Sequence, residues 1–226
     1  MVNEGIFFLE IFAIAASVVF SLYLCPAALM ALISLHVVLM NLFVTKQITL
    51  FGLNATSTDA LGIGAVLGIN LLREYCGSSA ARTSIIISFW AVFFYTFIAY
   101  TQLAYAPSLF DTQQLHFIAI LQPMPRILAA SLFSYVTVQS IEYWLYDRAH
   151  TYFKGKYFIL RNYGVVLFTQ FIDTVLFTVL GLSGLVDNIS EIILVSYLIK
   201  AVTILCMTPL LVVCKKVLEW TGHATF

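Results

Sequence analysis

Long apolar runs separated by short polar segments organise this sequence. Seven stretches are mostly apolar over about 20 residues, the length that an α-helix needs to cross the hydrocarbon core of a bilayer. Backbone N–H and C=O groups find no water in that core, so helices must carry these runs. The pattern predicts an all-α, polytopic integral membrane helical bundle of about seven transmembrane helices, with six as the alternative count. The stretches are residues 5–24, 26–44, 59–76, 83–105, 127–146, 163–182 and 189–213, and we interpret residues 1–226 as one transmembrane domain.

The boundaries between the runs carry ordinary helix signals. Cys25 and Pro26 are the only punctuation in the apolar stretch 5–44, and proline favours the first position of a helix. The polar segment that ends at Asp59 is expected to cap the third run. Gly64 and Gly68 form a GxxxG pattern that permits close helix packing. No basic region precedes the first run, so we expect a retained span and not a signal peptide.

The composition agrees with a membrane location. Hydrophobic residues make up 62% of the chain and charged residues 10%, with a mean hydropathy of +0.98, whereas soluble domains are about 45–50% apolar and about 25% charged. The 11 basic and 11 acidic residues cancel, so no basic field suggests a nucleic-acid partner. The four cysteines show no CxxC spacing and the four histidines no HExxH motif. We therefore expect no metal and no cofactor.

The basic residues between the runs are divided unevenly. Eight fall on one side of the predicted bundle, and only Lys46 and Arg126 fall on the other. The positive-inside rule assigns the larger group to the cytoplasm. We therefore expect the amino terminus outside and the carboxy terminus in the cytoplasm. The eight are Arg73, Arg82, Arg148, Lys154, Lys156, Arg161, Lys215 and Lys216.

Polar side chains inside the runs are the candidate functional groups, because membrane insertion selects against them unless they face a partner, a cavity or a substrate. Three amide–acid pairs each share one helix face, since their members are three or four residues apart. A further charge, Lys200, lies inside the last run. The pairs are Asn70 with Glu74, Gln139 with Glu142, and Gln170 with Asp173.

An amide beside a carboxylate suits a guanine-like edge. A carboxylate can accept two parallel hydrogen bonds, from a ring N–H and an exocyclic amine, while an amide reads the carbonyl. Aromatic side chains near these pairs offer faces for stacking. The alternative is structural: Asp173 pairs with Lys200 to neutralise both charges, and the glutamines bridge neighbouring helices.

The most specific motif is Asn70-x-x-x-Glu74-Tyr75-x-Gly77, which is followed by Ala81-Arg82. Read together with other matching positions, it resembles the queuosine precursor transporter family. That family is a vitamin-uptake-like group related to the substrate-binding subunits of energy-coupling-factor transporters. The likeness runs from about residue 49 to residue 184, and its other parts are the segments 50–59 and 170–177 with Arg126, Ser131, Gln139 and Arg161.

The resemblance implies a membrane uptake transporter for a 7-deazaguanine base, either a queuosine precursor or the finished base queuine, in the bacterial plasma (inner) membrane. Such a protein would serve the salvage of a tRNA modification, with a small deazapurine and the lipid bilayer as its partners. We expect a cavity near the bilayer midplane between the third, fifth and sixth runs, where Asp173 accepts from the ring. The substrate-binding candidates are Asn70, Glu74, Gln139, Glu142, Gln170 and Asp173, and the supporting or gating candidates are Arg82, Arg126, Arg161 and Lys200.

Three alternatives stay open. The chain has no GxxxxGK[ST] loop, so it does not hydrolyse ATP itself. It either works alone or is the substrate-binding subunit of a multi-subunit energy-coupled transporter with a different small heterocyclic cargo. A purely structural membrane subunit would bind no ligand. An intramembrane enzyme would need a nucleophile motif such as GxSxG, which the chain lacks, so we expect no catalytic residue.

Overall fold

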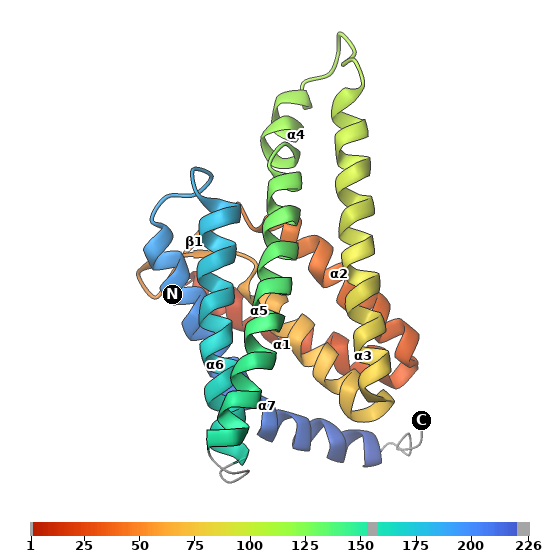
Figure 1. The fold of residues 1–226 in the computed structure, drawn as a ribbon. Coiled ribbons are helices and arrows are strands. Elements are labelled where there is room, and N and C mark those ends of the chain that lie inside the picture. The colour runs from red at the N-terminus through yellow and green to blue at the C-terminus, as the bar shows by residue number, and fades with distance from the viewer. Residues whose placement is uncertain (1, 153–157, 221–226) are drawn as a thin grey trace.

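The structure, a computed structural model, describes residues 2–152 and 158–220, and their side chains except at 139, 142–143, 146–147, 149–152, 158–163 and 205–220. This part of the chain is mainly helical (Figure 1). The helices are α1 (Val2–Leu24), α2 (Pro26–Phe43), α3 (Asp59–Ala104), α4 (Gln114–Leu121), α5 (Met124–Tyr152), α6 (Phe158–Phe177) and α7 (Ile189–Trp220), with a π-helical segment η1 (Thr178–Leu182) after α6.

Several helices have the length and the surface of membrane spans. Five segments in the described ranges are long and apolar enough to cross a bilayer: Val2–Leu24, Pro26–Phe43, Asp59–Ala104, Gln114–Val138 and Gly164–Leu182. Large apolar side chains, Phe12, Trp90 and Phe97 among them, are exposed on their outer faces, as suits helices surrounded by lipid. The integral membrane helical fold is therefore supported. The predicted count of seven is not confirmed, because α3 joins the runs 59–76 and 83–105 into one helix and much of the last run lies outside the residues whose side chains are described.

α3 changes direction at Gly77. This residue has φ 84° and ψ 168°, a non-helical conformation that glycine adopts without steric cost. The kink separates an N-terminal limb, residues 59–76, from a C-terminal limb, residues 78–104. The break that the sequence predicts between two runs is thus present as a kink and not as a loop.

The boundary between α1 and α2 lies where the sequence predicts it. Cys25 is the N-cap of α2, and its Sγ accepts from the backbone N–H of Ala28 at 3.4 Å. Pro26 occupies the first helical turn, where its missing N–H leaves no hydrogen bond unmade. The stretch 5–44 is therefore two helices.

A β-hairpin connects α2 to α3, where the sequence analysis expected only a capping segment. Strands β1 (Gln47–Leu50) and β2 (Leu53–Thr56) pair antiparallel. The turn between them places Phe51 at φ 51° and Gly52 at φ 82°, the two positive angles that tight hairpin turns require. Hydrogen bonds tie the hairpin to the starts of α1 and α7. The backbone N–H of Phe51 donates to Glu4 Oε1 at 3.0 Å, and Asn54 donates twice to Glu191 Oε2, at 2.9 and 2.8 Å.

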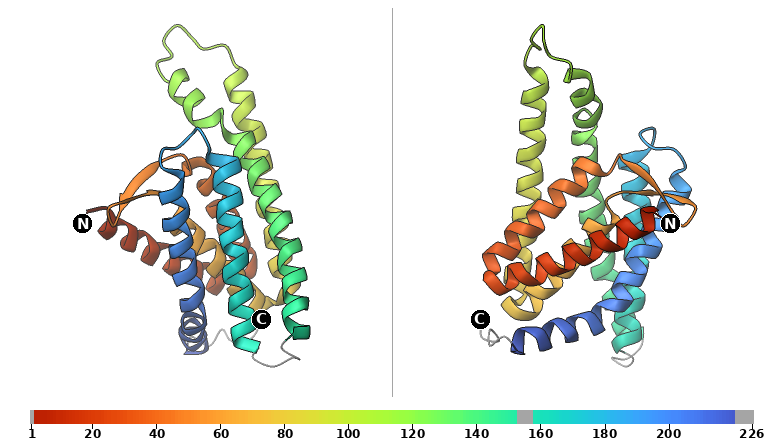
Figure 2. Two further views of the ribbon diagram at one scale, coloured as in Figure 1. Left: turned by 60° about the vertical axis from the view of Figure 1, so that its left-hand side comes forward. Right: turned by 180° about the vertical axis from the view of Figure 1, so that it is seen from behind.

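The helices form two layers that cross at a steep angle (Figures 1 and 2). The N-terminal layer consists of α1, α2 and the N-terminal limb of α3, and the C-terminal layer consists of the C-terminal limb of α3, α5, α6 and α7. The close packing predicted for Gly64 and Gly68 is confirmed within the N-terminal layer. A Cβ on Gly64 would overlap Ile14 of α1 and lie 3.0 Å from His36 of α2, and one on Gly68 would lie 2.7 Å from Ile33.

Candidate functional site

A cavity of about 260 Å³ lies between the two layers, beside the hairpin. Its walls come from α2, the end of the hairpin, both limbs of α3, α5, α6, η1 and α7. The sequence analysis expected a cavity bounded by the third, fifth and sixth runs, and all three contribute to this one. Its polar lining residues are Asn41, Thr56, Thr58, Asp59, Ser131, Ser134, Tyr135, Asp173, Thr174, Thr178, Ser196 and Lys200.

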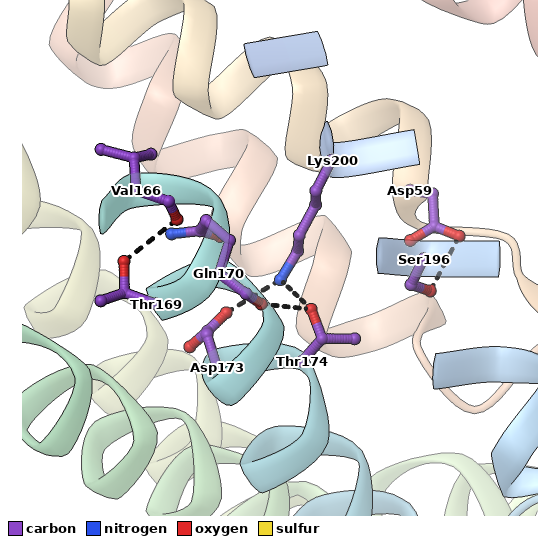
Figure 3. Close-up of polar contacts among 8 residues, drawn as sticks. All are labelled: Asp59, Val166, Thr169, Gln170, Asp173, Thr174, Ser196 and Lys200. Atoms are coloured by element: carbon purple, nitrogen blue, oxygen red, sulfur yellow. Dashed lines mark hydrogen bonds and ion pairs between the residues drawn. The ribbon is translucent and has the colours of Figure 1, made fainter. Parts of the chain in front are cut away.

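An ion pair joins α6 to α7 at the cavity wall (Figure 3). Lys200 Nζ donates to Asp173 Oδ2 at 2.8 Å and to Thr174 Oγ1 at 3.2 Å. The two charged side chains are 34% and 27% exposed, so they are paired but not sealed. An ammonium has three N–H donors and a carboxylate about four acceptor sites. Both groups therefore keep hydrogen-bonding capacity for a molecule in the cavity.

A second carboxylate, Asp59, lines the cavity from the first residue of α3. Its Oδ2 accepts from Ser196 Oγ at 3.1 Å (Figure 3). Ser196 and Lys200 are four residues apart on α7, so one face of this helix supplies the partners of both carboxylates. A helix N-terminus favours a negative charge, and this stabilises the Asp59 carboxylate in the cavity wall. The sequence analysis treated Asp59 only as a helix-capping residue.

Two buried polar atoms in the cavity wall have no hydrogen-bond partner in the described part of the chain. Asn41 is 8% exposed, and its Nδ2 donates to the carbonyl of Val37 at 2.8 Å while its Oδ1 is unpaired. Ser134 is 1% exposed and its Oγ is unpaired. Leaving a buried polar group unsatisfied costs about 1–3 kcal/mol. Both groups line the cavity, so a bound molecule could supply their missing partners.

Aromatic rings provide the apolar part of the wall. Phe89 from the C-terminal limb of α3 meets Tyr135 of α5 edge-on, with ring centroids 5.0 Å apart and planes at 61°. Phe177 of α6 contributes a third ring. The cavity thus combines aromatic walls with a few polar groups, the usual composition of a small-molecule site.

The other predicted substrate-binding residues with described side chains do not line this cavity. Asn70 is half-buried and Glu74 exposed on the N-terminal limb of α3, which meets the cavity only through Asp59. Gln170 is half-buried one turn before Asp173, and its carbonyl accepts from Thr174 Oγ1 at 2.8 Å. The side chains of Gln139, Glu142 and Arg161 lie outside the described residues.

The predicted supporting residues are divided in the same way. Lys200 lines the cavity, whereas Arg82 is exposed beyond the kink of α3. Arg126 is exposed as well, and its Nε donates to the carbonyl of Leu180 in η1 at 2.8 Å. That bond joins the start of α5 to η1, which contributes Thr178 and Leu182 to the cavity wall. Arg126 itself is not among the described lining residues, and its supporting role stays a prediction.

The sequence analysis missed Asn41, Asp59 and Ser134. Asn41 is a lone amide in an apolar run. A search for all polar residues at membrane depth includes it, whereas a search for amide–acid pairs does not. A single serine carries too little signal to be selected. No group of three or more His, Cys, Asp or Glu side chains that could hold a metal ion occurs in the part of the chain that was described.

Known proteins resemble most of the chain. Residues 62–214 match the model of a family described as "Putative vitamin uptake transporter". A protein of Bacillus subtilis (strain 168) named "Probable queuosine precursor transporter" is 28% identical over 181 residues, which cover 79% of each chain. No solved structure matches. The family match includes Asp173 and Lys200 but begins after Asn41 and Asp59.

Proposed function

Because the chain belongs to the vitamin uptake transporter family, we propose that it carries a 7-deazaguanine base, a queuosine precursor or queuine, across the plasma membrane into the cytoplasm. The relative from Bacillus subtilis is named for a queuosine precursor, and the cavity suits a flat, nitrogen-rich ring. The carrying observation is that the Asp173–Lys200 pair opens onto a cavity whose wall holds two unpaired buried polar atoms.

The hydrogen-bonding groups of the cavity complement those of deazaguanine. Asp173 accepts from the ring N–H and the exocyclic amine, because Oδ1 is not used by Lys200 and Oδ2 keeps a lone pair. The third N–H of Lys200 and the hydroxyl of Ser134 donate to the ring carbonyl. Asn41 Oδ1 accepts from a further ring N–H. Phe89, Tyr135 and Phe177 hold the faces of the ring, as aromatic side chains do for bases elsewhere.

The remaining predicted site residues belong to the same proposal. Most of these residues occupy positions where the chain resembles the queuosine precursor transporters, and the others share a helix face with such a position. They are Asn70, Glu74, Gln139, Glu142 and Gln170. Gln170 lies one turn beyond the cavity along α6. We assign Gln170, and Gln139 on the neighbouring helix α5, to the passage between the cavity and the cytoplasm.

The membrane arrangement that fits this function has seven spans. The two limbs of α3 count separately because Gly77 divides them, and α7 adds one more to the five apolar segments. The kink of α3, the end of α5, the start of α6 and the end of α7 lie at one end of the molecule (Figure 1). These segments carry most of the basic residues. Under the positive-inside rule this end faces the cytoplasm and the hairpin faces outward.

Uptake and binding assays test the proposal directly. Cells that neither make nor import queuosine precursors should acquire the modification in their tRNA when they express this chain and receive a deazaguanine. The purified protein should be stabilised against heat by deazaguanines and not by adenine, because ligands that bind only the folded state raise its stability. Asp173→Asn should abolish both effects, since an amide cannot accept two parallel hydrogen bonds.

A matched control keeps this result interpretable. Asp187 is exposed in the loop before α7, and Asp187→Asn makes the same chemical change away from the cavity. It should leave uptake and thermal stabilisation unchanged. Full uptake by the Asp173→Asn protein would remove that carboxylate from the binding site. Expression in cells that lack energising subunits separates a lone transporter from the binding subunit of a larger complex.

A further inference from the structure

The cavity contains more negative than positive charge. Its ionisable side chains are Asp59, Asp173 and Lys200, two acids against one base. Lys200 is bound to Asp173 at 2.8 Å. Asp59 bonds to the hydroxyl of Ser196 at 3.1 Å and to that of Thr56, and Lys200 attracts it only from beyond ion-pair distance. Among the described residues, the second carboxylate therefore has no ion-pair partner of its own.

An ionised carboxylate at membrane depth is expensive unless a cation or several hydrogen bonds accompany it. Two hydroxyls do not replace the lost hydration of a carboxylate. The described lining residues offer no second base to neutralise Asp59. A positively charged group on the cargo would supply what the protein does not.

An unpaired oxygen adds to the hydrogen-bond acceptors of the cavity. Asn41 Oδ1 is buried, accepts no hydrogen bond and lines the same cavity. Its partner must be a donor, because an amide oxygen only accepts. Together with the two carboxylates, this oxygen makes the cavity rich in acceptors. A cargo with several N–H groups and a positive charge satisfies more of these acceptors than a neutral one.

We propose that this cavity selects deazaguanines that carry a protonated amine on the 7-substituent, and that Asp59 is the ion-pair partner of that amine. The inference rests on the proposed function, in which Asp173 holds the ring. Asp59 of α3 and Asp173 of α6 lie on opposite sides of the Lys200 side chain in the view of Figure 3, so one carboxylate holds the ring and the other the substituent. Aminomethyl and substituted aminomethyl bases fit this arrangement, and the nitrile-bearing base does not.

Ligands of one ring and different charge test the selectivity on the unmodified protein. Binding of 7-aminomethyl-7-deazaguanine is compared with that of the 7-hydroxymethyl and 7-cyano analogues, which keep the ring and are neutral. We expect the amine to bind at least about tenfold more tightly than either analogue, which corresponds to about 1.4 kcal/mol. Equal binding of all three would overturn the inference and leave the proposed function intact. If neither these three bases nor queuine binds, the proposed function fails and the inference fails with it.

Substitution of Asp59 then assigns the selectivity to one residue. Asp59→Asn should lower the affinity for the amine to that of the hydroxymethyl analogue and leave the neutral analogues bound as before. Asp187→Asn is the control of the same chemistry and should keep the preference. If the Asp59→Asn protein does not fold, Asp59→Glu keeps the charge and should keep the preference.

Two outcomes contradict this assignment. An Asp59→Asn protein that still prefers the amine excludes Asp59 as its partner. A protein that loses uptake of charged and neutral bases equally, while binding both normally, would mean that Asp59 binds a coupling proton or metal ion and not the cargo.

Discussion

Replacing Lys200 with methionine separates the structural from the ligand-binding role of the ion pair in the cavity. Its Nζ bonds to Asp173 at 2.8 Å and to Thr174 at 3.2 Å. Removing one partner costs about 3–5 kcal/mol for a buried pair, whereas an exposed pair contributes only about 0.2–1 kcal/mol. The side chains are 34% and 27% exposed, between these limits. We therefore expect Lys200→Met to lower the free energy of unfolding by about 1–2 kcal/mol.

The double variant Lys200→Met with Asp173→Asn makes the distinction sharper. It removes both charges of the pair, so thermal unfolding in detergent should recover most of the stability lost in the single variant. Uptake of deazaguanine should stay absent, because the carboxylate that accepts from the ring is gone. Lys46→Met, at an exposed position outside the cavity, is the control and should change neither quantity. A double variant that regains both stability and uptake would refute the reasoning and reduce the pair to a link between helices.

Three further substitutions test the packing, the hairpin and the cavity wall. Gly64→Ala should destabilise the protein by about 1–3 kcal/mol in thermal unfolding. The control is Gly62→Ala, which should not destabilise it because the added Cβ would lie 3.6 Å from its nearest neighbour. Equal stabilities of the two variants would contradict the tight contact at Gly64. Glu191→Gln weakens the two bonds from Asn54, so amide hydrogen exchange in residues 47–56 should become faster, and unchanged exchange would mean that other contacts hold the hairpin. Asn41→Leu removes an unpaired buried oxygen and should raise the stability of the free protein by up to about 1 kcal/mol while it abolishes stabilisation by deazaguanines; normal ligand binding would exclude Asn41 from the site.

The apolar pattern was sufficient to predict the long helices but not the short α4, because lipid offers the backbone no partner outside a helix. The predicted starts at residues 26, 59 and 189 coincide with the first residues of α2, α3 and α7. The kink at Gly77 and the hairpin were not predicted. A single glycine in a polar segment does not reveal whether the chain bends or loops, and strands of four residues are too short for alternation to be recognised.

The ion pair was partly predictable, whereas the rest of the cavity was not. Asp173 and Lys200 are charged residues inside apolar runs, and this pattern alone makes them candidates for an ion pair. Asn41, Asp59 and Ser134 meet only because α2, α3 and α5 cross between two tilted layers. Spacing along one helix contains no information about such a crossing. The sequence could therefore supply one side of the site but not the opposite wall.

Depth along the helix, and not the choice of helix face, explains why Gln170 does not line the cavity. On α6 the described lining residues begin at Asp173. Gln170 lies about one turn before it, about 5.4 Å along the axis. An i, i+3 pairing fixes which face two side chains share, but it does not fix where along that face a cavity ends. A residue in a ligand site between several helices must lie on the right helix face and at the right position along the helix axis. Sequence periodicity indicates the face but not the position along the axis.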